Sequence, residues 1–165
     1  MNMRKRFGII ARISLIALLF SGITSCMKTD QFEESEQQQI DEFLAEQDID
    51  ADPKESGLYY IELIEGTGEV PVEGDTVDVY YRGSFLDGRL FDTNMDSDPF
   101  RFTVGTGYVI EGWDEGITYM KKGGEALFII PSSLAYGSAG TYGIPGYTPL
   151  LYEVVLENVI PGPNR

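Results

Sequence analysis

The sequence contains no histidine and a single cysteine, Cys26. These absences exclude Ser-His-Asp and Cys-His catalysis, histidine-based metal sites and cysteine clusters. No disulfide can form within one chain. We therefore expect neither a metal nor a cofactor, although composition alone leaves hydrolysis by paired carboxylates open.

Basic residues are also scarce, with 12 Lys and Arg against 27 Asp and Glu and a net charge of -15. Nucleic acid is not an expected partner, because phosphate binding needs a basic patch. The excess of acid is typical of a soluble surface, and it leaves open a role in attracting basic clients.

No apolar run near the N-terminus is long enough for a lasting transmembrane helix. Residues 7–23 are mostly apolar, but Arg12 interrupts them and leaves residues 13–20, far short of the ~20 residues that span a bilayer. A positively charged segment, residues 1–6, precedes this run. The pattern predicts a cleaved signal peptide over residues 1–25.

This segment ends at Cys26, and residues 23–26 resemble the bacterial lipobox, in which an aliphatic and two small residues precede cysteine. Ile23 and Ser25 stand where that pattern prefers Leu and Gly or Ala. The resemblance implies cleavage before Cys26 and its acylation, for example with palmitate, and acyl chains anchor a protein because each buried CH₂ contributes ~0.8 kcal/mol. We expect a bacterial lipoprotein, preferably of the outer membrane, with its domain in the periplasm or at the cell surface. The alternative is a buried free cysteine.

Residues 26–56 are polar and acidic and predict a largely flexible tether. Ile40, Phe43 and Leu44 have helical spacing, which predicts a short helix within residues 39–47. Its apolar stripe would cap the domain, pair with another copy, or have no function. An Asp-Pro pair at residues 52–53 marks a break before the globular domain, residues 57–165.

In the globular domain, four segments alternate between apolar and polar residues, as strands do when one face is buried. Their expected apolar faces are Tyr59, Ile61 and Leu63; Val77, Val79 and Tyr81; Phe100, Phe102 and Val104; and Tyr152, Val154 and Leu156. Residues 126–130 are apolar throughout and predict a central strand.

One segment has helical period instead. Trp113, Ile117 and Met120 predict a helix over residues 112–120. Acidic residues in its first turn and Lys121 and Lys122 at its end match the helix dipole, and a glycine follows as a stop. The predicted fold class is α+β, an antiparallel sheet with one short helix against its dry face.

Three groups of short strings then occur in a characteristic order. They are YYRG at 80–83 with LDGRLFDT at 86–93; PFRF at 99–102 with VG at 104–105 and VIEGWDEG at 109–116; and IP at 130–131 with AYG at 135–137 and LLYEVVL at 150–156. In this order and spacing they resemble the FKBP-type peptidyl-prolyl isomerases, the immunophilins that bind rapamycin, over about residues 57–162.

The resemblance implies a twisted antiparallel sheet wrapped over one short helix, with an aromatic pocket between them. By position, Trp113 would form the floor of this pocket. Its walls would be Tyr81, Phe91, Asp92, Phe100, Val109, Ile110, Tyr136, Ile144 and Tyr152.

The resemblance also implies an activity, the acceleration of X-Pro bond rotation. Rotation is slow because it breaks amide resonance, with a barrier of ~18–20 kcal/mol. A dry aromatic pocket that favours the twisted amide needs no nucleophile. Trp113, Phe100, Tyr81 and Val109 would hold the proline ring. The catalytic groups would be the Ile110 N–H and the Tyr136 hydroxyl, which bond substrate carbonyls, and Asp92, held by the Tyr81 hydroxyl.

Simpler interpretations remain for several of these residues. Phe102 is expected to be core, and Trp113, Tyr81 and Phe100 would serve as core alone if there were no site. Asp92 would then be a turn or capping residue.

The sequence departs from the family pattern at two places. The loop at residues 137–145 is slightly shortened and lacks the histidine and paired isoleucines often found there. Tyr152 stands where phenylalanine is usual, which adds a hydroxyl at the pocket edge.

The expected partners are proline-containing unfolded or partly folded exported proteins, with a rapamycin-like macrolide as a further expected ligand. Two alternative functions are a non-catalytic FKBP-like client-binding lipoprotein and an unrelated carbohydrate-binding surface lipoprotein. Some family members dimerise through long N-terminal helices. The segment here is short, which favours a monomer.

Overall fold

A computed structural model describes residues 23–163, with side chains described from residue 31 onward. The predicted signal peptide lies outside the described residues, except for its last three positions. The elements are α1 (Ile23–Glu46), β1 (Tyr59–Ile64), β2 (Thr76–Phe85), β3 (Leu90–Thr93), β4 (Phe100–Thr103), α2 (Glu111–Ile117), β5 (Glu125–Ile130), the 3₁₀ helix η1 (Ser132–Leu134) and β6 (Leu150–Ile160).

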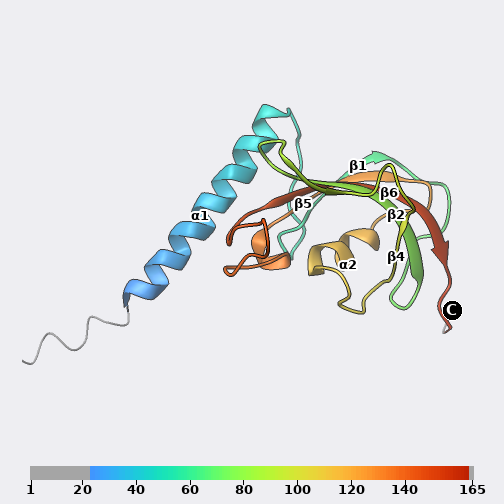
Figure 1. The fold of residues 1–165 in the computed structure, drawn as a ribbon. Helices are drawn as coiled ribbons and strands as arrows, with labels where there is room; N and C mark the ends of the chain where they lie inside the picture. The colour runs from blue at the N-terminus through green and yellow to red at the C-terminus, as the bar shows by residue number, and fades with distance from the viewer. Residues whose placement is uncertain (1–22, 164–165) are drawn as a thin grey trace, which may run out of the picture. The chain divides into compact units, whose positions relative to one another are not determined.

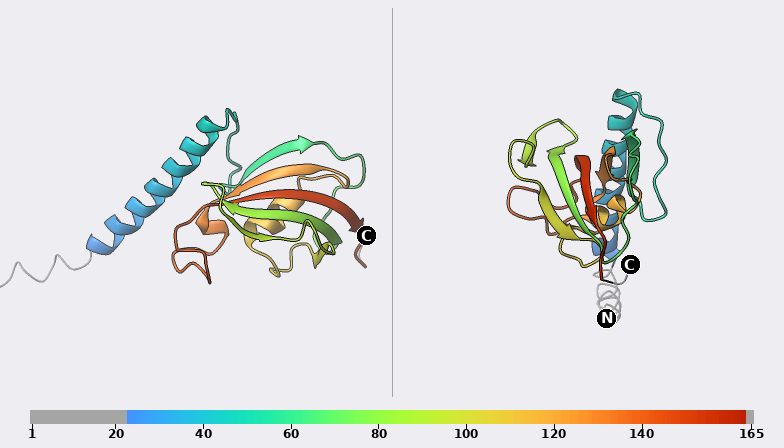
Figure 2. Two further views of the ribbon diagram at one scale, coloured as in Figure 1. Left: turned by 45° about the horizontal axis from the view of Figure 1, so that its top comes forward. Right: turned by 90° about the vertical axis from the view of Figure 1, so that its right-hand side faces the viewer.

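The strands form one antiparallel sheet of six strands in the order β1-β5-β6-β2-β3, and β4 also pairs with β2. Figures 1 and 2 show the sheet twisting and curving over α2, which lies across its concave face. The predicted α+β class and the wrapped antiparallel sheet are confirmed. The sheet carries one feature that sequence periodicity did not indicate, the short strand β3.

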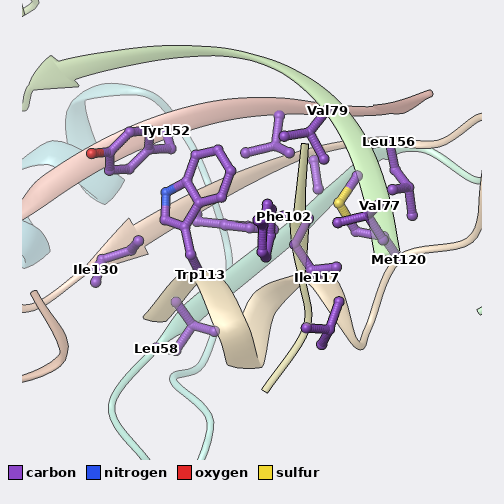
Figure 3. Close-up of a cluster of buried hydrophobic side chains, with 14 of the residues drawn as sticks. Leu58, Val77, Val79, Phe102, Trp113, Ile117, Met120, Ile130, Tyr152 and Leu156 are labelled. Carbon is purple, nitrogen blue, oxygen red and sulfur yellow. The ribbon is translucent and has the colours of Figure 1, made fainter. Parts of the chain in front are cut away.

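The main core lies between α2 and the sheet. Trp113, Ile117 and Met120 come from α2 and the turn after it and pack in one buried cluster with Phe102 and Val79 of the sheet (Figure 3). These five side chains are at most 4% exposed. The predicted apolar faces of β2, β4 and β6 contribute to this core, so alternation identified the buried side of three strands correctly.

Helix α2 is shorter than predicted, because it ends at Ile117 rather than at Met120. The next three amides bond to carbonyls three residues earlier, which tightens the last turn while Met120 remains buried. Lys121 and Lys122 therefore do not lie in the last helical turn. Lys121 pairs with Glu65 and Lys122 donates to Asn158 at 2.6 Å, so their predicted role at the helix dipole is wrong.

Two glycines let α2 approach the sheet closely. A Cβ atom on Gly112 would lie 2.4 Å from the side chain of Ile130, and one on Gly116 would lie 2.7 Å from the ring of Phe128. Both distances are shorter than real contacts allow. The close approach places Trp113, between these glycines, deep against the strands.

Helix α1 is much longer than the predicted helix over residues 39–47. Its residues 23–34 belong to one compact unit and its residues 35–46 to the unit that contains the sheet. Polar side chains one turn apart support it, because Gln37 donates to Asp41 at 2.7 Å and Gln38 donates to Glu42 at 2.8 Å. The helix predicted within residues 39–47 is present but begins much earlier, so the expectation of a largely flexible tether is wrong for residues 26–46. Gln and Glu are good helix formers, and the weak apolar pattern concealed this propensity.

The C-terminal half of α1 packs against part of the outer face of the sheet. Ile40 and Leu44 are buried in a second cluster with Tyr59 of β1 and Ile129 of β5. The sequence left three roles open for this apolar stripe. In the structure the stripe caps the domain. Tyr59 and Ile61 of β1 thus face α1, whereas Tyr60 packs against the main core and Leu63 is exposed.

None of the described helices combines the length and the apolar character needed to cross a bilayer.

Candidate functional site

A hollow of about 200 Å³ opens between α2, the sheet and the loops beside them. Its lining is mostly aromatic, and it joins segments that are far apart in the sequence. The lining residues are Tyr81, Asp92, Phe100, Tyr108, Val109, Ile110, Trp113, Tyr136 and Tyr152.

Trp113 forms the floor of the pocket. Its indole ring meets the rings of Tyr81 and Tyr152 edge to face, each with 5.2 Å between ring centres and planes at 89°. On the core side, the ring centre of Phe102 lies 5.9 Å from that of Trp113. These arrangements are the favoured ones for aromatic pairs, so the floor is fixed before any ligand enters.

The Phe100 wall depends on the pairing of β4 with β2. Phe100 lies opposite Val79, and the neighbouring pair is Asp78 with Arg101. Arg101 donates two hydrogen bonds to the buried Asp78 carboxylate, at 2.6 and 2.9 Å. This contact holds the pKa of Asp78 below its usual range. The ion pair keeps β4 in register, so Phe100 meets Tyr81 with 6.1 Å between ring centres.

Tyr81 and Asp92 form the polar pair predicted from the sequence. The Tyr81 hydroxyl donates to the Asp92 carboxylate at 2.7 Å. Burial raises the pKa of Tyr81, and the bond to Asp92 raises it further, so this tyrosine keeps its proton at neutral pH. Asn94 fixes the same position of β2 by accepting from the Tyr81 N–H at 2.7 Å. Asp92 itself is exposed at the rim rather than enclosed.

Asp114 of α2 holds the loop before the helix. Its carboxylate accepts from the N–H groups of Gly105 and Gly107 at 2.9 and 3.0 Å. The loop then delivers Val109 and Ile110 to the pocket. The Ile110 carbonyl accepts from Trp113 at 2.9 Å. The backbone N–H of Ile110 donates to no other described residue, so it is available to a ligand carbonyl.

Two further tyrosines, Tyr136 and Tyr152, contribute to the pocket wall. Their side chains both line the pocket and interact electrostatically. Burial raises the pKa of Tyr152, with smaller contributions from Tyr136, Tyr81 and Asp92. The hydroxyl by which Tyr152 differs from the family's usual phenylalanine therefore interacts with another pocket tyrosine, and the Tyr152 ring lies edge to face with Trp113.

Eight of the predicted residues surround this hollow, but two do not line it. Phe91 packs its ring against Phe85 and Tyr152, at 5.2 and 5.7 Å between ring centres. Ile144 is a buried member of the core. Phe91 thus supports the wall from behind, through Tyr152.

Tyr108 lines the hollow and was missed by the sequence reasoning. Its ring stacks on Phe100 with 6.2 Å between centres, and it is 71% exposed. An aromatic residue directly before the predicted site residues Val109 and Ile110 was the available signal.

The site contains no nucleophile paired with a base. Within the described part of the chain, no group of three or more acidic or cysteine side chains is arranged to hold a metal ion. The arrangement offers an apolar floor, a free N–H and tyrosine hydroxyls. Such a site can bind an apolar ring with its flanking carbonyls.

Comparison with known sequences matches residues 68–157 to the FKBP-type peptidyl-prolyl cis-trans isomerases. FkpA, an FKBP-type peptidyl-prolyl cis-trans isomerase of Escherichia coli strain K12, is 42% identical over 110 residues, which are 66% of this chain and 40% of FkpA. The FK506-binding protein of Neisseria meningitidis serogroup B is 42% identical over 105 residues, covering 62% of this chain and 96% of that protein. The sequence match thus spans less than half of FkpA's own length but nearly all of the Neisseria relative.

Comparison with solved structures points to the same family. The crystal structure of Escherichia coli FkpA aligns with a TM-score of 0.71 at 35% identity, over 85% of this chain and 64% of FkpA. A peptidyl-prolyl cis-trans isomerase from Pseudomonas syringae aligns with a TM-score of 0.68 at 30% identity, over 81% of this chain and 96% of that one. The protein is therefore a member of the FKBP-type peptidyl-prolyl cis-trans isomerase family.

Proposed function

We propose that this protein catalyses cis/trans isomerisation of X-Pro bonds in exported proteins. The observation that carries the proposal is the aromatic pocket, in which Trp113 is 4% exposed and stands edge to face with Tyr81 and Tyr152. Family membership supports the same activity.

In this proposal the proline ring lies on Trp113 between Phe100, Tyr81 and Val109. The planar amide has a polarised carbonyl that water stabilises, and the aromatic walls displace that water. The planar ground state is thereby weakened relative to the twisted one. Each ~1.4 kcal/mol of preference for the twisted amide gives a tenfold rate increase.

The polar groups would orient the substrate. The Ile110 N–H and the Tyr136 hydroxyl would donate to substrate carbonyls. Asp92, held by Tyr81, would face the twisting carbonyl from the rim as a fixed charge. No covalent bond forms or breaks, which agrees with the absence of a histidine or an activated nucleophile from the pocket lining.

Replacing Asp92 with leucine should lower kcat/KM roughly tenfold while leaving stability nearly unchanged. A hydrogen bond to a charged group is worth about 1.5–3 kcal/mol, and solvent at the exposed rim reduces the contribution to the lower end. Parallel activity and thermal-unfolding measurements check this. Asp96→Leu, an exposed acid outside the pocket lining, is the control, and equal rates in the two variants would remove Asp92 from the site.

A protease-coupled assay with a short X-Pro peptide tests the activity. The proposal predicts acceleration that a rapamycin-like macrolide blocks, since relatives carry the name FK506-binding protein. Macrolide binding by a folded protein without acceleration would instead indicate a client-binding module.

We further propose that the chain is a bacterial lipoprotein anchored through Cys26, preferably in the outer membrane. The positive segment at residues 1–6, the short apolar run and the lipobox-like residues 23–26 support this. The clients would then be proline-containing exported proteins.

Replacing Cys26 with serine should abolish incorporation of labelled palmitate and move the protein from the membrane to the soluble fraction. The reason is that the thiol is the acceptor of the lipid in this proposal. Labelling of cells followed by fractionation checks it. Palmitate that remains on the serine variant would contradict anchoring at Cys26.

A further inference from the structure

Helix α1 contacts the segment beside the pocket through one buried carboxylate. Glu36 is 5% exposed, on the same face of α1 as Ile40 and Leu44, which pack against the sheet. It lies four residues before Ile40, and that spacing places both on one side of a helix. No lysine or arginine among the described residues pairs with it.

Both oxygens of Glu36 accept hydrogen bonds from a single residue, Ser132. One accepts from the Ser132 backbone N–H, and the other accepts from its hydroxyl at 2.7 Å. Ser132 is also 5% exposed. A buried carboxylate is costly unless its oxygens are satisfied, so this contact specifies where α1 meets the start of η1.

Ser132 in turn holds the backbone around Tyr136. Its carbonyl accepts from the N–H of Ala135 at 3.0 Å and from the N–H of Gly137 at 2.8 Å. These two residues flank Tyr136, whose side chain lines the pocket. One continuous set of hydrogen bonds therefore runs from α1 to the segment that carries a pocket tyrosine.

We propose that Glu36 is a positioning residue for Tyr136: through Ser132, it fixes the turn that presents the Tyr136 hydroxyl to the substrate carbonyl. The activity readout of this inference rests on the proposed isomerase function. The helix before the domain is then part of the machinery that sets catalytic geometry, in addition to being a cover for the sheet.

Steady-state kinetics of the purified full chain tests the proposal. Glu36→Ala should lower kcat/KM about tenfold, because misplacement of a binding group by about 1 Å can cost up to a hundredfold. Glu36→Gln, which retains an acceptor and a donor for Ser132, should recover most of the activity. Ser132→Ala should fall between them. Glu42→Ala, an exposed glutamate on the same helix, should change the rate by less than about twofold.

A double-mutant cycle distinguishes positioning from general stabilisation. In a Tyr136→Phe background, Glu36→Ala should have almost no further effect, because the hydroxyl that it positions is gone. An equal loss with and without the Tyr136 hydroxyl would overturn the proposal, as would wild-type activity in Glu36→Ala.

Amide hydrogen exchange gives a readout that does not need activity. Glu36→Ala should accelerate exchange at Ala135 and Gly137 while amides of β6 keep their protection. If the wild-type chain proves inactive, the proposed function fails, and this measurement still decides on Glu36. Unchanged protection at both amides would overturn the positioning role.

Discussion

Replacing Trp113 with alanine should lower the free energy of unfolding by about 3–5 kcal/mol, the usual cost of removing a large buried aromatic side chain. The ring is 4% exposed and contacts the rings of Tyr81, Phe100, Phe102 and Tyr152. Its loss leaves a void between α2 and the sheet, because the closely packed Gly112 and Gly116 leave the helix little room to move inward. Denaturant unfolding followed by circular dichroism measures the change.

The same substitution should lower kcat/KM roughly ten- to hundredfold in protein that is still folded. The proline ring would lose an apolar surface worth about 1.5–3 kcal/mol. Trp113→Phe is the matched variant, since it retains an aromatic floor of smaller area and should lose less of both quantities. Full activity in a stably folded Trp113→Ala protein would show that the tryptophan serves the core alone.

Replacing Ile40 with alanine should destabilise the protein by about 2–5 kcal/mol. Ile40 is 1% exposed and packs with Leu44, Tyr59 and Ile129 on the outer face of the sheet. A helix without this contact would uncover the cluster to water. Thermal or denaturant unfolding of the purified chain checks the value.

Leu63→Ala provides the control for Ile40→Ala. Leu63 belongs to β1 and is 53% exposed, so its truncation should change stability by about 0.5 kcal/mol or less. Equal stability of the two variants would mean that α1 is not docked on the sheet in solution, and the positioning role of Glu36 would fail with it.

Local sequence patterns predicted the strands well because alternation is a local property. Val77 and Val79, or Val154 and Leu156, reveal their buried face within a few residues. The apolar side of β1 was also recognised, yet Tyr59 and Ile61 pack against α1 rather than into the main core. Periodicity identifies which residues share a face but does not identify what covers that face.

The errors in the helices have a similar origin. The apolar stripe of α1 is confined to its last two turns, so the polar residues before it resembled a flexible tether. The contact that gives the helix its position joins Glu36 to Ser132 across 96 residues. No pattern within a window of the sequence can reveal a contact of that separation.

The candidate site depended on the family resemblance, because the lining residues come from β2, β3, β4, α2, β6 and two loops. The Tyr81–Asp92 bond is present as the resemblance implied. The resemblance did not indicate Tyr108, whose exposed ring extends the aromatic wall, nor the interaction between Tyr136 and Tyr152. The first follows from the path of one loop, and the second arises from a residue in which this chain departs from the family pattern.

The most direct test of the central claim is exchange spectroscopy by NMR on a short X-Pro peptide with a small amount of the protein. We expect the cis and trans signals to interconvert many times faster than in the free peptide, where isomerisation takes tens to hundreds of seconds, and expect most of the acceleration to disappear with Trp113→Ala. Peptide signals that shift on binding while the exchange rate stays at its uncatalysed value would contradict the account, because the pocket would then bind proline without catalysing its isomerisation.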